Sequence, residues 1–220
     1  MRLVERFTMN VTESGTALLS AAPIRNEPVQ ARSTARLATL LDSAAAVIDE
    51  IGYERLTTAM VAERAGASIG TVYRYFPDRI AVLQALGARN TERLLAAIAP
   101  ALAAGRHGSA TEVMLAVLDA TSELFRSEPG FRSVRVGDVI DLLPPQTETT
   151  AHAAVAEVIA DALVAGYGIA DTADTRRAVG TAVEVIDALV ARAFARAPQG
   201  DAALLDEARR ALTAVLAGRL

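Results

Sequence analysis

The sequence predicts an all-α protein. Hydrophobic residues make up 52% of its 220 residues, and alanine, the strongest helix former, supplies much of that fraction. Aromatic residues, which favour strands, amount to only 4%. Apolar residues recur at helical spacing between glycine and proline breaks. We therefore expect about nine helices, arranged as an N-terminal three-helix domain and a larger helical C-terminal domain.

Composition limits the possible functions. The chain has no cysteine, which excludes disulfides and thiolate metal sites. No apolar run approaches the roughly 18 residues that span a bilayer, and the N-terminus lacks the compact apolar core of a signal peptide. We expect a cytoplasmic protein with no membrane partner. The formal charge is +1 over residues 1–94 and −5 over residues 95–220, so the first half is the better candidate for binding a polyanion.

The N-terminal domain is expected to follow an arm. Residues 1–31 mix polar residues and two prolines without a sustained apolar period, which predicts a disordered arm. Residues 32–84 form the expected three-helix domain. Its first helix should run from about Ser33 to Ile51, because one apolar stripe covers this stretch and Gly52 is a natural helix stop.

The most informative stretch runs from Thr57 to Arg79. Thr57 is a good N-cap for a short helix that ends at Gly66, and Ser68 is the N-cap of a second short helix that ends before Pro77. Two short helices joined by a glycine turn are the outline of a helix-turn-helix, whose second helix enters a groove of DNA.

The larger helical domain is expected over residues 85–220. Asp78 caps a helix that is expected to run to about Ala99, where Pro100 interferes. Further helical patterns, separated by proline or glycine residues, cover 110–127, 131–143, 148–167, 174–197 and 201–217.

Helical geometry orients the side chains of the second short helix. At 100° per residue, Ile69, Val72 and Phe76 should face inward. Glycine on the outward face permits a close approach, and hydroxyls or arginine can bind phosphates and base edges. Thr58 can bind the opposite backbone, and Arg79 adds a charge. The expected outward residues are Gly70, Thr71, Arg74 and Tyr75, with Tyr73 at the margin.

Two alternatives stay open at this point. Tyr73 and Tyr75 could be ordinary packing residues of a connecting helix. Arg25, Arg32 and Arg36 belong either to an unstructured tail or to an arm that reaches into a minor groove. The caps, turn and stop at these spacings together favour DNA binding.

This stretch resembles the N-terminal signature of the TetR family of transcriptional regulators. The residues that carry the resemblance are Gly52, Thr57, Thr58, Val61, Ala62, Ala65, Gly66, Ser68, Gly70, Thr71, Val72, Tyr73, Tyr75, Phe76 and Leu83. The resemblance implies a homodimer that binds double-stranded operator DNA and has a regulatory domain for a small-molecule effector. By position, it assigns DNA contacts to Thr58, Gly70, Thr71, Tyr73, Tyr75 and Arg79.

Two features depart from the family's pattern. Arg79 stands where members usually have lysine, and it should still bind a phosphate. Ala59 and Ile69 are apolar where some members carry polar base readers. We therefore expect few direct base contacts, and we expect the specificity for the operator to depend more on dimer spacing and DNA shape.

The last two helices are the expected dimer face. Apolar stripes run along both, and the resemblance implies a four-helix bundle built from two helices of each subunit. The alternative is that these stripes cover the protomer's own core. A two-fold dimer would place its recognition helices roughly 34–36 Å apart and predicts a near-palindromic operator. The candidate interface residues are Val183, Ile186, Val190, Phe194, Leu205, Leu212 and Leu216.

The effector site is less clearly marked. Candidate residues for an apolar pocket between the middle helices are Phe125, Phe131, Val134, Ile140, Leu143 and Tyr167, with plain core packing as the alternative for each. Candidate polar anchors are Arg132, Arg135, Asp138, Asp141 and His152. The two histidines are too isolated for a metal site.

No nucleophile motif, phosphate loop or cofactor motif is present, so we expect no enzyme. The function that the sequence predicts is a repressor that its effector releases from DNA. An activator of the same fold is one alternative. The other is a helical small-molecule-binding protein with an unused DNA-binding head.

Overall fold

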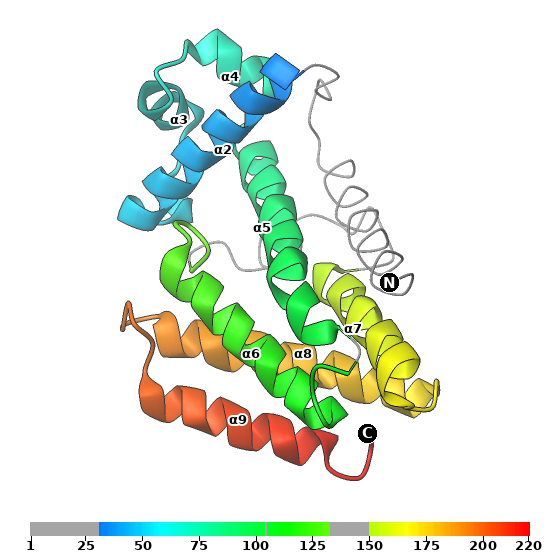
Figure 1. Cartoon of the computed structure of the whole chain (residues 1–220). Helices are drawn as coiled ribbons and strands as arrows, with labels where there is room; N and C mark the ends of the chain where they lie inside the picture. Colours follow the sequence, from blue (N-terminus) through cyan, green and yellow to red (C-terminus); the bar gives the residue numbers. More distant parts are fainter. Residues whose placement is uncertain (1–30, 104, 133–149) are drawn as a thin grey trace.

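The computed structural model describes residues 31–103, 105–132 and 150–220. These residues form eight α-helices and one short 3-10 helix, with no strand among them (Figure 1). The predicted all-α class is confirmed, and the helices in this part of the chain come close to the expected number. They are α2 (Ala31–Ile51), η1 (Tyr53–Arg55), α3 (Thr58–Arg64), α4 (Ile69–Tyr75), α5 (Arg79–Leu102), α6 (Ala110–Ser127), α7 (Ala151–Tyr167), α8 (Ala173–Phe194) and α9 (Ala202–Leu216).

Helices α2, α3 and α4 form an N-terminal bundle at the top of Figure 1. The predicted caps are present: the side chain of Thr57 accepts a hydrogen bond from the N–H of Met60, and that of Ser68 accepts one from the N–H of Thr71, both at 3.2 Å. Gly66 adopts the left-handed φ of 58° that the turn between α3 and α4 requires. The bundle has its own core, which includes Leu40, Ile48, Val61, Val72, Phe76 and the first turns of α5 up to Leu86.

Helix α5 joins this bundle to a second hydrophobic core, which begins at Leu94. The helix continues through Pro100 to Leu102, so the expected end near Ala99 was wrong. A proline in a helix removes one hydrogen bond, here to the carbonyl of Ala96. Ala96 is exposed, so water can satisfy this carbonyl and the last turn persists.

The second core lies between the lower part of α5 and helices α6 to α9. Helix α8 packs against α6, α7 and α9, which places it at the centre of this region (Figure 1). Helix α7 begins at Ala151 because Thr150 caps it, accepting from the N–H of Ala153 at 3.1 Å, and it ends at Gly168 in the left-handed conformation. No helix within the described ranges is both long and apolar enough to cross a membrane.

A buried arginine ties α5 to α2. Arg89 donates one hydrogen bond to the Asp42 carboxylate at 2.7 Å and another to the carbonyl of Leu41 at 3.3 Å. Burial lowers the pKa of the Arg89 guanidinium, and the neighbouring Arg93 lowers it further. Arg93 itself forms an ion pair with Glu128 just beyond α6. These contacts connect α2, α5 and α6 through one set of charges.

Candidate functional site

Helix α4 presents a short exposed face to solvent. Val72 and Tyr75 pack inward, whereas Gly70, Tyr73 and Arg74 are exposed. The helix contains no acidic residue. Three of the residues predicted to contact DNA therefore lie on one accessible surface without negative charge.

Two side chains of α4 are oriented differently from the prediction. Ile69, which was expected to face inward, is 43% exposed. Tyr75, which was expected to face outward, is only 5% exposed, and its hydroxyl oxygen lies 3.1 Å from that of Ser33 on α2. Because α4 has only seven residues, its first residue lies beyond the edge of the core and its last turn packs against α2. Tyr75 therefore positions α4 in the N-terminal bundle.

Two substitutions of Tyr75 should separate the contribution of its packing to the stability of the fold from that of its hydrogen bond. Tyr75→Phe is expected to destabilise the fold by about 1 kcal/mol, the usual value of one hydrogen bond. Tyr75→Ala should cost about 3–5 kcal/mol, because it leaves a cavity under α4. Urea denaturation of the two variants tests this difference, and equal losses would show that the hydroxyl contact, rather than packing, fixes the helix.

Neighbouring hydroxyl groups hold the exposed face of α4. Thr58, the first residue of α3, donates a hydrogen bond to the Tyr73 hydroxyl at 3.4 Å. The hydroxyl of Thr71 lies 2.9 Å from that of Ser68, the N-cap. The structure thus brings Thr58 and Tyr73, which are 15 residues apart, onto one surface, with Thr71 in the same short helix.

Arg79 lies at the start of α5. Its guanidinium donates to the carbonyl of Glu54 at 2.7 Å, which ties the first turn of α5 to η1. The side chain is exposed, so its remaining N–H groups can reach a phosphate.

The exposed large hydrophobic side chains of the described residues all belong to this end of the molecule. They are Tyr53, Met60, Ile69 and Tyr73. Two of them, Ile69 and Tyr73, belong to α4, the helix that is predicted to enter DNA. The helical pattern missed Ile69 because it takes no account of where a helix begins relative to the core.

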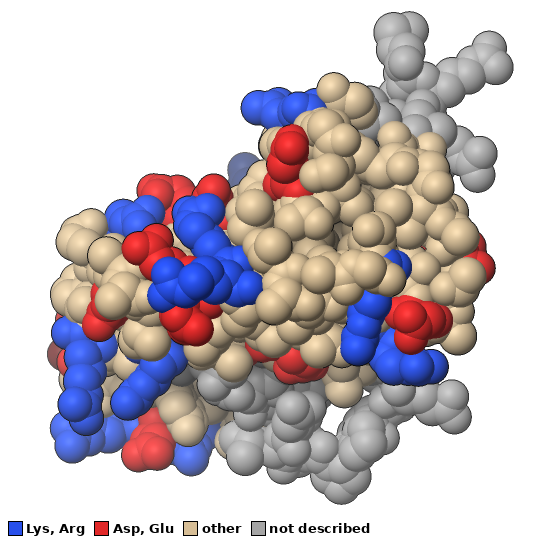
Figure 2. Space-filling model, turned by 90° about the horizontal axis from the view of Figure 1, so that it is seen from below, with Lys and Arg blue, Asp and Glu red and all other residues tan. Residues whose placement is uncertain are grey.

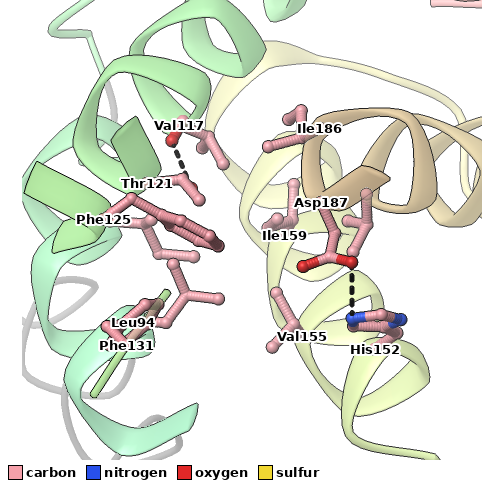
Figure 3. A pocket seen from close by; sticks show the side chains of 12 residues that line it. Leu94, Val117, Thr121, Phe125, Phe131, His152, Val155, Ile159, Ile186 and Asp187 are labelled. Atoms are coloured by element: carbon pink, nitrogen blue, oxygen red, sulfur yellow. Dashed lines mark hydrogen bonds and ion pairs between the residues drawn. The ribbon is translucent and has the colours of Figure 1, made fainter. Parts of the chain in front are cut away.

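A pocket opens within the second core, among α5, α6, α7 and α8 (Figure 3). Its cavity volume is about 20 Å³, counted as the space open to the centre of a water-sized sphere. Phe125 and Phe131 line it, as predicted from the sequence, and their rings meet edge to face with centroids 5.4 Å apart. His152, a candidate polar anchor, also lines it. The lining residues that were not predicted for the pocket are Leu94, Ile98, Val117, Thr121, Val155, Ile159, Val183, Ile186 and Asp187.

Of the other predicted pocket residues, Tyr167 is the one that the structure describes. Tyr167 does not line this pocket, because its hydroxyl donates to the carbonyl of Ala103 at 2.9 Å and joins the ends of α7 and α5. Val134, Ile140 and Leu143 lie outside the described residues.

Polar side chains gather at one end of the pocket. His152, in the first turn of α7, lies 3.1 Å from Glu184 through Nδ1 and 3.8 Å from Asp187 through Nε2. Both carboxylates belong to α8 (Figure 3 shows the contact with Asp187). No group of three or more potential metal ligands occurs in the part of the chain that the structure describes.

Six of the seven predicted dimer residues are buried within the protomer. Val183, Ile186, Val190, Phe194, Leu212 and Leu216 belong to the second core, and Leu205 is half-buried against it. The stripe along α8 packs against α6 and α7 of the same chain, so its side chains are already covered within the protomer, and their assignment to a dimer face stays a prediction. An apolar stripe identifies a buried face without identifying what buries it.

The turn after α6 connects the pocket to the N-terminal bundle. Phe131 lines the pocket, whereas its neighbours Gly130 and Arg132 contact α2. A Cβ atom at Gly130 would lie 2.9 Å from the Cα of Ala45, and Arg132 forms an ion pair with Asp49 at 3.3 Å. We call residues 128–132 the connecting turn.

Comparison with known families agrees with this arrangement of two cores. Residues 40–86 match the model of the tetR family of bacterial regulatory proteins, and residues 108–220 match that of the tetracyclin repressor-like C-terminal domain. The chain belongs to the TetR family. Members of this family are DNA-binding regulators of transcription and not enzymes, as the sequence predicted.

Relatives support the assignment over different lengths. The HTH-type transcriptional repressor KstR of Rhodococcus jostii is 32% identical over 84 residues, and the regulator BetI of Escherichia coli is 35% identical over 80 residues. The match with this chain spans about 40% of the length of each of these two relatives. A TetR-family regulator structure from Streptomyces coelicolor is 34% identical, covers 84% of this chain and 99% of its own, and has a TM-score of 0.68.

Proposed function

We propose that this TetR-family protein is an effector-responsive repressor that binds a near-palindromic operator as a homodimer. The observation that carries the DNA-binding part is the exposed face of α4, which bears hydroxyls, an arginine and apolar groups but no carboxylate. The repressor relatives favour repression over activation. Transcription from the regulated promoter should rise in a deletion strain, whereas a fall would indicate an activator.

The proposed DNA contacts use the accessible residues of the N-terminal bundle. Tyr73 and Arg74 would bind phosphates, Thr71 a phosphate or base edge, and the exposed Ile69 a thymine methyl group. Thr58 and Arg79 would bind the flanking backbone, and Gly70 would permit close approach. Tyr75 would act indirectly, because it holds α4 against α2.

Replacement of one exposed arginine should test this surface. Arg74→Ala is expected to weaken operator binding about tenfold and to reduce the salt dependence by roughly one counterion, because one phosphate contact is lost. Footprinting and fluorescence anisotropy at several salt concentrations measure both effects. Arg177→Ala, which removes an exposed arginine of α8, is the matched control and should bind as the wild type does. An equal loss in both variants would contradict the assignment.

We assign the dimer contact to the outer faces of α8 and α9. Half-buried or exposed apolar residues remain there, including Val185, Ala188 and Leu189 on α8 and Leu204 and Val215 on α9. Figure 2, seen from the side of α9, shows a broad area with few charged side chains next to a more charged area. Light scattering should give twice the chain mass of 23.0 kDa, and a monomer would contradict the palindromic operator.

The connecting turn supplies a route for the proposed release from DNA. In this proposal, residues 32–84 bind DNA, residues 85–220 bind the effector and dimerise, and α5 belongs to both. An effector that displaces Phe131 must move Gly130 and Arg132, and these two residues contact α2. The effector shifts the equilibrium only if it binds the displaced conformation more tightly.

A further inference from the structure

Two exposed arginines lie near the start of α2. The sequence left Arg32 and Arg36 either in an unstructured tail or in an arm, whereas the structure places both within α2, which begins at Ala31. They are four residues apart, so their side chains project from the same side of the helix. The positions of both arginines are therefore set by a helix of the N-terminal bundle.

This end of α2 is held next to α4. The hydroxyl oxygen of Ser33, which follows Arg32, lies 3.1 Å from that of Tyr75 in the last turn of α4, and Figure 1 shows the first turn of α2 beside α4. Tyr75 is buried, so the contact belongs to the packing of the bundle. The arginines thus lie close to the helix that is proposed to enter the groove.

Helical geometry gives the side of α2 from which the arginines project. At 100° per residue, Arg32 points in the same direction as Glu50, and Arg36 lies about 40° from it. Glu50 faces α3, because it forms an ion pair with Arg64 at 2.6 Å. Asp49, which forms an ion pair with the connecting turn, lies about 100° away from Arg32. The arginines therefore project from the side of α2 that faces α3.

Folding leaves the charges of these arginines unbalanced. Neither Arg32 nor Arg36 forms an ion pair or a hydrogen bond with a residue that the structure describes. Cations are also unfavourable near the start of a helix, where the helix dipole is positive, and the first turn of α2 contains no acidic residue. By contrast, the carboxylates of α2, on Asp42, Asp49 and Glu50, all have arginine partners. An external anion would balance the positive charge.

We propose that Arg32 and Arg36 bind backbone phosphates of operator DNA beside the bases that α4 reads. Residues four apart on a helix have their Cβ atoms about 5–6 Å apart, which is close to the separation of neighbouring phosphates along one strand. A guanidinium group can donate two parallel hydrogen bonds to each phosphate. This inference rests on the proposed function, because it adds a contact to the proposed complex with the operator.

The double variant Arg32→Ala/Arg36→Ala tests the contact. Fluorescence anisotropy should show weaker binding by at least about tenfold, and a salt dependence that is lower by roughly two counterions for each protomer. Phosphate contacts carry no sequence information, so the footprinted operator and an unrelated duplex of equal length should lose affinity by the same factor. A loss confined to duplexes with A·T-rich flanks would place the arginines in a minor groove and overturn the inference.

Arg106→Ala/Arg177→Ala is the matched control. It removes two exposed arginines from the part of the chain that contains the second core, so it changes the net charge equally and should bind DNA as the wild type does. Equal losses of affinity in the two double variants would overturn the inference. Thermal unfolding should show that Arg32→Ala/Arg36→Ala is at least as stable as the wild type, because it removes cations from the start of a helix. A clearly less stable protein would show that the arginines have a role within the fold.

Uncharged methylphosphonate linkages, placed one at a time in the operator, locate the contact. At one or more linkages in each half-site, the substitution should weaken binding by the wild type and by Arg74→Ala, but not by Arg32→Ala/Arg36→Ala. If all three proteins lose affinity at the same linkages, the arginines of α2 bind no phosphate.

The same measurements separate this inference from the proposed function. If Arg74→Ala weakens operator binding and Arg32→Ala/Arg36→Ala does not, the contact by α2 is refuted and the DNA-binding function stands. If the wild type shows no salt-dependent binding to any duplex, the proposed function itself fails.

Discussion

Gly130→Ala is expected to destabilise the protein by about 3 kcal/mol, because two separate costs coincide at this position. Gly130 has a φ of 74°, which is unfavourable for any residue with a Cβ atom. The added methyl group would also lie 2.9 Å from the Cα and 3.0 Å from the carbonyl oxygen of Ala45. Both of these are backbone atoms of α2, so neither the turn nor the helix can relieve the contact by rotating a side chain.

Gly105→Ala is a close control for this substitution. Gly105 has the same φ of 74°, but a Cβ atom there would meet nothing within 4 Å. Gly105→Ala should therefore lower the free energy of unfolding only by the backbone cost of about 1 kcal/mol. Urea denaturation of both variants gives the difference, which measures the contact between the connecting turn and α2. If both glycines cost the same, the turn does not pack against α2 as described.

Calorimetry of Gly130→Ala should also show less cooperative unfolding. The N-terminal bundle has its own core, and the connecting turn is one of its contacts with the rest of the chain. When that contact is lost, the bundle is expected to melt first. A weakened connection of this kind would also reduce the response of DNA binding to an effector, since the proposed route passes through Gly130 and Arg132.

The helix ends of this protein could be predicted because they depend on local residues. Thr57, Ser68 and Asp78 each cap the helix that follows, and each cap forms within three residues of the capping side chain. Gly52 and Gly66 end helices because only neighbouring backbone atoms decide their conformation. Such signals are contained in a short window of sequence.

The orientation of side chains could be predicted less well because it depends on distant partners. Tyr75 turns inward to reach Ser33, which is 42 residues away, and no periodicity within α4 indicates this contact. The stripe on α8 was assigned to a dimer face, and nothing in the stripe itself identifies α6 and α7 as the helices that cover it within the protomer. Likewise, His152 and Asp187 meet only because α7 packs on α8.

Gly70→Glu is expected to lower operator affinity about 100-fold or more, because the new carboxylate would face the DNA phosphates at the position of closest approach. Gly70→Ala should lower it less, since it adds bulk without charge. The fold should tolerate both changes. A Cβ atom at Gly70 would meet only the Ser68 hydroxyl, at 3.8 Å, which is ordinary contact distance.

The stability of both Gly70 variants should rise while their affinity for the operator falls, so the two measurements together separate a loss of DNA binding from misfolding. Alanine is favoured over glycine in a helix by about 0.5–1 kcal/mol, and a carboxylate in the first turn of α4 gains from the helix dipole. Thermal unfolding should therefore show both Gly70 variants to be at least as stable as the wild type. Gly180→Ala in α8, another helical glycine with open space around it, should be stabilised similarly and bind DNA normally. Misfolding cannot explain a variant that is more stable and yet binds the operator more weakly, so this result would assign the loss of affinity to the surface of α4. Unchanged affinity of Gly70→Glu would show that α4 does not enter the groove.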